Sequence, residues 1–377
     1  MKICYIGHGP YPHNVPFYVH TQLLGELGCE VHAIAWHRPG DPVVEKVGTV
    51  CVHRLPEGVV SSASSPSAIA RFVRAVREIL LTIDQVDLVH VSAGIGVSLL
   101  PLLLRKRIPH WVLEIRSPPL HGGVRVLLSR LRMRAEAMFF DRIFVHARAV
   151  ADDIFGDGAH KMIELPIGVD FEHFRPGAND ELRTTLGLSK TELVLVYSGS
   201  ISTLRQLDRL LAGFALACHS LPNLHLLMLG EGDDAERLRQ LANQLGIAGR
   251  VHFLGFVPYA KVPQQLHVAD IGLGYVPMTA WYENAPVLKT MEFLASGLPT
   301  IATATQGNQH YIRHGENGLL VDDTPEAIAA SIIMLGQDPQ LRAKFRAVAC
   351  GSIRQYDFRT IVRTVLLPAY QAVVATN

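Results

Sequence analysis

Residues 284–302 read NAPVLKTMEFLASGLPTIA, and this stretch holds one complete helix-to-strand connection. A loop ends at Pro286, and a helix of about ten residues with an apolar face follows it. Gly297 ends that helix and Pro299 prevents its continuation, so the residues from Thr300 onward form a strand. The stretch therefore predicts an α/β protein.

The same alternation of β-branched runs with amphipathic segments extends from this stretch to both ends of the chain. It is typical of parallel βαβ units, and because it occurs in two series it predicts two doubly wound domains. Residues 165–177 are punctuated by proline and glycine and form the predicted linker, which gives domains at 1–168 and 169–357. The strands are expected at 2–6, 30–35, 88–91, 111–115 and 142–145, and at 193–197, 224–229, 251–254, 271–273 and 300–302.

The composition excludes several classes of protein. The chain has 377 residues, enough for two domains of roughly 150 residues each. Apolar residues make up 49% and charged residues 18%, which excludes a disordered chain, and a net charge of +1 argues against a dedicated nucleic-acid binder. The cysteines at positions 4, 29, 51, 218 and 350 form no CxxC pair and no metal-ligand cluster, so we expect reduced thiols in a cytosolic chain.

No membrane-spanning segment is predicted. The N-terminal MKICYIG is interpreted as a strand, because its apolar run is too short for a signal peptide and no small-residue cleavage site follows. Residues 88–104 carry no Asp, Glu, Lys or Arg, but they contain Pro101 and fall just short of the roughly 20 residues of a bilayer span. We expect a buried strand leading into a buried helix there, in a protein that is soluble or attached to a membrane surface.

The helix within 284–302 carries a candidate anion site. Lys289 and Glu292 are three residues apart in its first turns and therefore share one face. Free backbone N–H groups at a helix start favour an anion, and Lys289 adds a positive charge there. Glu292 could accept hydrogen bonds from vicinal hydroxyls, as on a ribose. The alternative is a solvated Lys–Glu pair on the surface.

Two loops that follow strands are candidate phosphate sites. Gly199 and Ser200 come after the strand at 193–197, and Arg205 follows closely, so that the backbone could approach a phosphate and the guanidinium could clamp it. Gly230 and Glu231 come after the strand at 224–229 and resemble a turn on the nucleotide side of such a site. The alternative for both loops is a plain connection.

These pieces together resemble glycosyltransferase family 4, whose members have the GT-B fold. The second half carries the resemblance over about 200 residues, and the first half matches more loosely through DLVHVSAG and VLEIRSPP. The resemblance implies two Rossmann-like domains facing across a cleft, with a final helix at about 358–377 that packs back on the first domain. The matching phrases of the second half are PIGVDFEHFRP, YSGSISTLRQLDRLLAGFALA, LHLLMLGEGDDAERLRQLANQLG, VHFLGFVPYAKVPQQLHVADIGL and KTMEFLASGLPTIATATQGNQHYIRHGENGLLVDD.

The resemblance also implies roles for single residues. Arg205 falls where the family has a Lys or Arg on the donor pyrophosphate, and Lys289 is assigned to the diphosphate or donor sugar. Glu292 falls on the second Glu of the family's paired-glutamate motif, which holds the ribose, whereas the first Glu of that motif is replaced by Asn284. The base is expected along the backbone of Phe256 and Val257. Further donor contacts are expected at Gly199, Ser200, Gly230, Glu231, Ala285, Val287 and Leu288, and catalytic roles at Arg205, Lys289, Asn284 and Arg116.

The first half departs from the family pattern near the expected acceptor site. The loop at 8–16 lacks the diglycine that family members often have, and Arg116 replaces their frequent catalytic-site His, as it does in some relatives. His13, Asn14, Arg116 and His121 are therefore candidates for contacts with the acceptor or the donor sugar. The alternative for each is an ordinary polar loop residue.

A basic helix is predicted at 124–134. Between Pro101 and Val150 the chain has ten Lys or Arg residues against three acidic ones, a net charge of +7. Such a helix can contact anionic lipid at the inner face of a membrane. The alternatives are a surface helix whose apolar side packs on the sheet, and an acidic acceptor.

The resemblance implies a retaining glycosyltransferase that moves a sugar from a nucleotide sugar to a hydroxyl acceptor, without a metal or other cofactor. UDP is favoured over GDP on family frequency alone. Two alternatives remain open: a catalytically silent subunit that binds the nucleotide sugar, and an epimerase or hydrolase of the same fold. The sequence does not indicate the sugar, the acceptor, the linkage or the oligomeric state.

Overall fold

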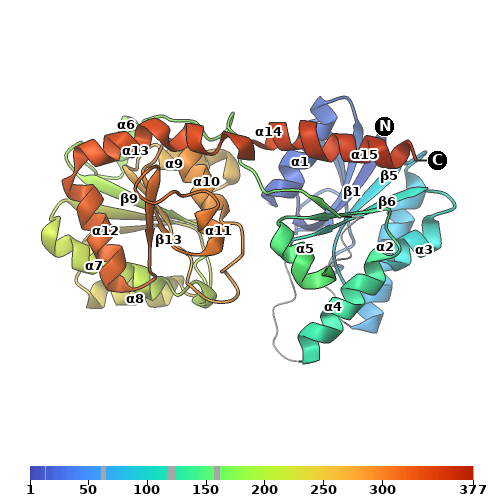
Figure 1. The fold of residues 1–377 in the computed structure, drawn as a ribbon, viewed down its shortest axis with the longest axis horizontal. Coiled ribbons are helices and arrows are strands. Elements are labelled where there is room, and N and C mark those ends of the chain that lie inside the picture. The colour runs from blue at the N-terminus through green and yellow to red at the C-terminus, as the bar shows by residue number, and fades with distance from the viewer. Residues whose placement is uncertain (13, 61–64, 117–123, 157–161, 377) are drawn as a thin grey trace. The chain divides into compact units, whose positions relative to one another are not determined.

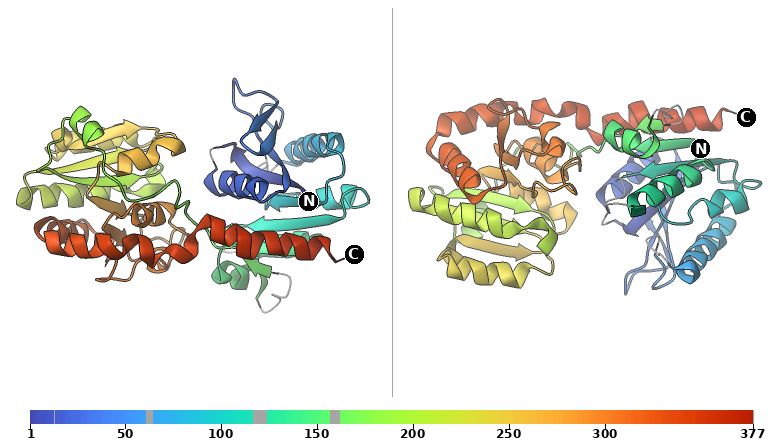
Figure 2. Two further views of the ribbon diagram at one scale, coloured as in Figure 1. Left: turned by 90° about the horizontal axis from the view of Figure 1, so that it is seen from above. Right: turned by 60° about the horizontal axis from the view of Figure 1, so that its bottom comes forward.

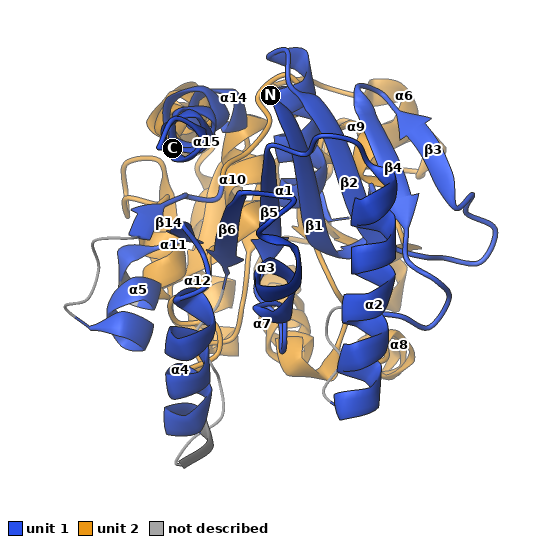
Figure 3. Cartoon of the chain, turned by 90° about the vertical axis from the view of Figure 1, so that its right-hand side faces the viewer, with its two compact units in different colours: residues 1–167, 358–377 blue, residues 168–357 orange. Residues whose placement is uncertain are grey.

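The computed structural model describes residues 1–12, 14–60, 65–116, 124–156 and 162–376 (Figure 1). The chain divides into two compact units (Figure 3). Unit 1 comprises residues 1–167 together with 358–377, and unit 2 comprises residues 168–357. Each unit contains one mainly parallel sheet with helices on both faces, so the predicted α/β fold with two Rossmann-like domains is confirmed.

Unit 1 has an eight-stranded sheet in the order β3-β4-β2-β1-β5-β6-β7-β8. All neighbours are parallel except β3, which pairs antiparallel with β4 at the edge. The strands are β1 (Lys2–Pro10), β2 (Glu30–Trp36), β3 (Val44–Val47), β4 (Val50–Arg54), β5 (Leu88–Ser92), β6 (His110–Ile115), β7 (Arg142–Val145) and β8 (Met162–Glu164).

Two apolar layers enclose this sheet. One face carries helices from the middle of unit 1, and the other carries the first helix together with the C-terminal segment (Figure 2). Asn14 and Ser65 cap helices that have proline in their first turn, which satisfies free backbone N–H groups. The helices are α1 (Val15–Glu26), α2 (Pro66–Thr82), α3 (Leu99–Leu104), α4 (Val124–Ala137), α5 (Arg148–Phe155), α14 (Phe358–Ile361), a π-helical turn (Val362–Leu366) and α15 (Leu367–Val374).

Two details differ from the sequence interpretation. The first strand continues to Pro10 and α1 begins at Val15, so the loop expected at 8–16 is shorter than predicted. The strand and helix expected at 88–104 both form, but α3 is buried on one side only, because Leu102 and Leu103 are more than half exposed. Among the described residues no helix is both long and apolar enough to cross a membrane.

Unit 2 has a six-stranded parallel sheet in the order β11-β10-β9-β12-β13-β14. The strands are β9 (Leu193–Ser198), β10 (Leu224–Leu229), β11 (Val251–Gly255), β12 (Ile271–Gly274), β13 (Thr300–Thr303) and β14 (Gly318–Val321). The helices are α6 (Asp180–Thr185), α7 (Leu207–Ser220), α8 (Ala235–Gln244), α9 (Val262–Leu266), α10 (Leu288–Ala295), α11 (Gln306–Gln309), α12 (Pro325–Gln337) and α13 (Pro339–Ser352).

In each sheet, the direction in which successive strands are added reverses at one point. In unit 2 the chain builds outward from β9 through β10 to β11, and then starts again on the other side of β9 with β12. In unit 1 the reversal lies between β1 and β5. Ligands of open α/β sheets bind outside the carboxyl ends of the strands at such a reversal, so each unit has one expected binding edge.

Candidate active site

Two adjoining cavities lie at the binding edge of unit 2. They have volumes of about 310 Å³ and about 250 Å³, and both are lined by Ser198 and Gly199 at the carboxyl end of β9. The larger one extends toward the start of α10, and the smaller one extends over the loops that follow β10 and β11. The position is the one that the strand order predicts for a ligand.

Glycines allow the two loops to approach each other here. Gly199 and Gly230 have positive φ angles of 140° and 141°. A Cβ on Gly230 would lie 1.9 Å from the carbonyl oxygen of Gly199, and the N–H of Gly199 donates to Leu229 O at 2.9 Å. No larger side chain fits at Gly230, so the backbone itself lines the smaller cavity.

Lys289 lies in the first turn of α10 with its side chain almost buried, at 7% exposure. Its ammonium group lies 3.7 Å from the centroid of the Tyr197 ring and donates to Tyr275 O at 3.2 Å. Burial and the nearby Arg205 hold the pKa of Lys289 well below its usual range. Among the described residues no carboxylate lies within ion-pair distance of it, although Glu292 attracts it from farther away, so a bound anion would supply a closer charge partner.

Arg205 reaches the same cavity from the other side. It ends a 3₁₀ turn, Thr203–Arg205, directly before α7. Its guanidinium group lies 4.7 Å from the centroid of the Tyr282 ring, a stacking arrangement that fixes the planar group. One arginine and one lysine side chain therefore line one cavity of about 310 Å³.

Glu292 completes the cavity one turn after Lys289. Burial raises the pKa of its carboxyl group to about 7, and the neighbouring Lys289 opposes that rise. Within the described part of the chain its carboxylate accepts no hydrogen bond from a side chain or backbone group. The oxygens are therefore free to accept bonds from ligand hydroxyls.

The structure brings most of the predicted donor residues together. Asn284 is the exception, because it is exposed and lines neither cavity. The adjacent Glu283 accepts a hydrogen bond from the backbone of Gln306 at 3.3 Å. The larger cavity is lined by Gly199, Arg205, Ala285, Val287, Leu288, Lys289 and Glu292, and the smaller one by Gly199, Ser200, Gly230, Glu231, Phe256 and Val257.

A third cavity, of about 330 Å³, lies at the binding edge of unit 1. One of its lining residues is Glu114, which is fully buried near the end of β6. The Glu114 carboxylate accepts hydrogen bonds from Tyr5 at 2.8 Å and Ser92 at 3.3 Å, and it contacts Arg116 at 3.1 Å and His146 at 2.8 Å. Burial alone would raise the pKa of Glu114, but Arg116 and His146 outweigh it and hold that pKa well below its usual range.

The structure describes two of the four residues predicted on the acceptor side, Arg116 and Asn14. Arg116 lines the unit 1 cavity and donates to Asn14 Oδ1 at 3.0 Å. Asn14 caps α1 and donates to His8 O at 2.6 Å, so it holds the loop together, as an ordinary polar loop residue does. His13 and His121 lie outside the described residues.

Sequence reasoning did not single out His8 or Glu114, which both line this cavity. His8 lines it, with Nε2 2.6 Å from Ala93 O, and burial lowers the pKa of its ring. Glu114 is the other, and the available signal was an acidic residue inside the apolar run HWVLEI. A charge in a fully buried strand needs partners, so it marks a place where several strands contribute polar groups.

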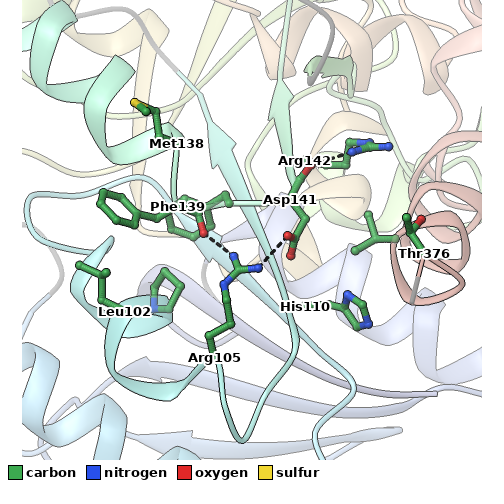
Figure 4. A pocket seen from close by; sticks show the side chains of 11 residues that line it. Leu102, Arg105, His110, Met138, Phe139, Asp141, Arg142 and Thr376 are labelled. Atoms are coloured by element: carbon green, nitrogen blue, oxygen red, sulfur yellow. Dashed lines mark hydrogen bonds and ion pairs between the residues drawn. The ribbon is translucent and has the colours of Figure 1, made fainter.

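A larger cavity, of about 590 Å³, lies elsewhere in unit 1 (Figure 4). It is found at the amino ends of β6 and β7, beside His110 and Arg142, and the Arg105–Asp141 ion pair of 2.9 Å lies across it. Because ligands of such sheets bind at the carboxyl ends, we do not place the active site there.

Comparison with known proteins identifies the family. Residues 18–173 match the model described as Glycosyltransferase Family 4, and residues 178–349 match Glycosyl transferases group 1. The EpsD protein of Bacillus subtilis (strain 168), which carries the name of a glycosyltransferase, is 30% identical over 332 residues, or 85% of this chain and 83% of that protein.

Solved structures show the same fold. A sucrose-phosphate synthase from Thermosynechococcus elongatus has a TM-score of 0.81 with 19% identity over all of both chains. The HepE protein of Anabaena, in complex with UDP and glucose, has a TM-score of 0.69 with 17% identity, covering 99% of this chain and 100% of that one. The chain is a glycosyltransferase of the GT-B type and belongs to glycosyltransferase family 4.

Proposed function

We propose that this enzyme is a retaining glycosyltransferase that moves a sugar from a nucleotide-sugar donor, in first place a UDP-sugar, to a hydroxyl acceptor. One observation carries the proposal: Arg205, Lys289 and Glu292 line a single cavity at the reversal point of the unit 2 sheet. Arg205, together with a Lys289 that a bound diphosphate would hold in its charged form, suits a diphosphate. The partly buried Glu292 carboxylate, which accepts no hydrogen bond within the described part of the chain, suits the hydroxyls of a ribose. The likeness to the Anabaena HepE protein, whose structure holds UDP and glucose, supports UDP as the nucleotide.

The proposed chemistry follows from where charge develops. When the bond from the anomeric carbon to the diphosphate breaks, positive charge develops on the sugar and a further negative charge on the leaving group. Arg205 and Lys289, which line the cavity, stabilise that negative charge where it develops. The departing phosphate oxygen accepts the proton of the acceptor hydroxyl on the same face of the sugar, which gives retention without an enzyme nucleophile. The proposal requires no metal, because these side chains carry the counter-charge.

The first test is a thermal-shift screen with UDP, GDP, dTDP and ADP. We expect UDP to raise the unfolding temperature, because a ligand at 100 times its dissociation constant stabilises by roughly 2.7 kcal/mol. Glu292→Ala should weaken UDP binding at least tenfold, whereas the control Glu326→Ala, an exposed residue of α12, should bind as the wild type does. Arg205→Ala should mainly lower turnover of the UDP-sugar.

Each outcome of this test is decisive. No shift with any nucleotide would overturn the proposed donor site. Nucleotide binding without turnover of any sugar donor would favour the silent binding subunit. Release of free sugar or an epimerised nucleotide sugar, in the presence of hydroxyl acceptors, would favour the hydrolase or epimerase.

We also propose that α4 contacts an anionic membrane surface. Leu127, Leu128 and Leu131 are 57%, 58% and 50% exposed, which supports lipid contact over packing against the sheet. Arg130 pairs with Asp153 and Arg132 with Glu136, so apolar insertion carries more of the proposed binding than net charge does.

Vesicle flotation tests this second proposal. The wild type should float with vesicles that contain an anionic lipid, and Leu127→Glu together with Leu131→Glu should abolish flotation. The control Leu216→Glu changes a leucine of α7 that is 44% exposed and should float normally. A wild type that remains in the bottom fraction, or a double variant that still floats, would refute the membrane contact.

A further inference from the structure

His32, Cys51 and His53, whose side chains can all bind a metal ion, meet on the sheet of unit 1. None of the three lines any of the four cavities described above. Strands β2 and β4 are parallel neighbours, and His32 lies directly opposite Cys51 in their register. His53 is two residues after Cys51, so all three side chains project from the same face of the sheet. Their ligand atoms all lie within 4.8 Å of one another.

Two of the distances between these atoms are close to those of a tetrahedral metal site. His32 Nδ1 lies 2.9 Å from His53 Nε2, and Cys51 Sγ lies 3.6 Å from the same nitrogen. With metal–nitrogen bonds of about 2.05 Å and a metal–sulfur bond of about 2.3 Å, two ligands of a tetrahedral Zn²⁺ are separated by about 3.3 Å for two nitrogens and about 3.6 Å for nitrogen and sulfur. A small opening of the two imidazoles therefore suffices to admit the ion.

A carboxylate lies behind one of the ligands, as is common around bound zinc. Glu30 Oε1 is 3.3 Å from His32 Nε2, and Lys2 holds the same oxygen at 3.0 Å. When the Nε2–H of His32 donates to Glu30, the lone pair of Nδ1 points toward Cys51 and His53. Such a partner fixes the orientation of a ligating ring and increases its basicity.

We propose that His32, Cys51 and His53 bind one zinc-class divalent transition-metal ion that links β2 to β4. Two imidazoles and one thiolate are the ligands that Zn²⁺ prefers, whereas Mg²⁺ and Ca²⁺ prefer oxygen. The fourth position is left for water. On binding, the Cys51 thiol releases its proton to solvent and the sulfur donates an electron pair to the ion.

The sequence interpretation, which found no metal-ligand cluster among the cysteines, did not anticipate this proximity. The partners of Cys51 come from two strands that only the fold brings together. The proposed metal site is independent of the proposed glycosyl transfer. None of its three residues lines the Glu114 cavity of unit 1 or the two cavities of unit 2.

Titration of the full chain with Co²⁺ tests the proposal. The protein is freed of purification tags and stripped with a chelator, and Co²⁺ is then added while the thiolate-to-cobalt charge-transfer band is recorded. We expect the band to saturate at one Co²⁺ per chain and Zn²⁺ to displace the cobalt. Cys51→Ser should lose the band, and the control Cys350→Ser, in α13 of unit 2, should keep it.

Two further variants keep the test decisive if Cys51→Ser fails to fold. His32→Gln and His53→Gln retain the thiol, and each should lower the Co²⁺ affinity at least tenfold. Added Zn²⁺ should raise the unfolding temperature of the wild type and of Cys350→Ser, but not of His53→Gln. A wild type without a saturating band, or a band that persists unchanged in all three site variants, would show that the two imidazoles form only a hydrogen-bonded pair.

Discussion

At the residue scale, the partly buried Glu292 carboxyl makes the stability of the protein depend on pH. Burial raises its folded-state pKa from 4.5 to about 7. Ionising this group therefore costs more in the folded state, and the cost grows as the pH rises from 4.5 through 7. Glu292→Gln should gain stability over the wild type across that window, by at most about 3 kcal/mol at pH 8, and should match it near pH 4.

Urea unfolding at pH 4.5 and at pH 8 measures this difference. Glu326→Gln serves as the matched control, because it makes the same change at an exposed residue in the first turn of α12. An equal stability difference between Glu292→Gln and the wild type at both pH values would contradict the raised pKa.

Lys289 gives a second prediction at this scale. Burial and Arg205 depress its pKa in the free enzyme, and a diphosphate beside it would restore the charged form. Binding of UDP should therefore take up protons, to at most about one per site, and the uptake should be smaller in Lys289→Met. Calorimetry in buffers of different ionisation enthalpy measures the uptake. The same dependence on the buffer in wild type and variant would exclude Lys289 as the group that titrates.

The residues that line the unit 2 cavities were predictable from the sequence because short segments carry them. Lys289 and Glu292 lie one turn apart on α10, and the resemblance to glycosyltransferase family 4 placed Arg205, which follows the β9 loop closely, at the same site. The surroundings of Glu114 were not predictable, because Tyr5, Ser92 and His146 come from β1, from β5 and from the residue after β7. The same holds for Cys51 and His32. Cross-strand neighbours depend on sheet order, which spacing along one chain does not contain.

At the element scale, the close backbone contact between the loops that follow β9 and β10 shapes the smaller cavity. Gly230→Ala would place a Cβ 1.9 Å from Gly199 O and force the loops apart. We expect UDP affinity to fall at least tenfold, because the displaced backbone lines the nucleotide side of the cavity. The control Gly246→Ala also puts alanine at a positive φ, of 69°, but its Cβ meets open space. That variant should lose about 1 kcal/mol of stability and keep its UDP affinity.

Isothermal titration of both variants with UDP checks this prediction, with thermal unfolding as the measure of stability. A Gly230→Ala protein that binds UDP as tightly as the wild type would show that these loops do not hold the nucleotide. The sequence predicted both strands and the glycine turns after them. It did not predict that the two turns touch, because that contact depends on how β9 and β10 are paired.

At the scale of the whole molecule, unit 1 is built from both ends of the chain. Residues 358–377 complete it, and Phe358, Val362 and Leu366 are buried in its core. Tyr370 also hydrogen-bonds to the buried His90. The sequence resemblance indicated this return of the last helix, and packing explains it, since α1 alone leaves the apolar side chains of one sheet face uncovered.

This arrangement predicts which fragments fold. Residues 168–357 form a continuous segment with its own sheet and core, so the fragment alone should fold and bind UDP. Residues 1–167 alone should not fold stably, because loss of the C-terminal helices exposes buried side chains, each worth roughly 1.5–3 kcal/mol.

A linked form of unit 1 tests this expectation. Val169 N donates to Tyr356 O at 2.8 Å, so the two points where the chain passes between the units lie side by side. A short Gly/Ser linker can therefore join residue 167 to residue 358. That linked unit 1 should unfold cooperatively in a thermal melt followed by circular dichroism, whereas residues 1–167 should not. If residues 1–167 melt at the same temperature as the linked unit, the C-terminal helices contribute nothing to its stability, and the burial of their apolar face would need another explanation.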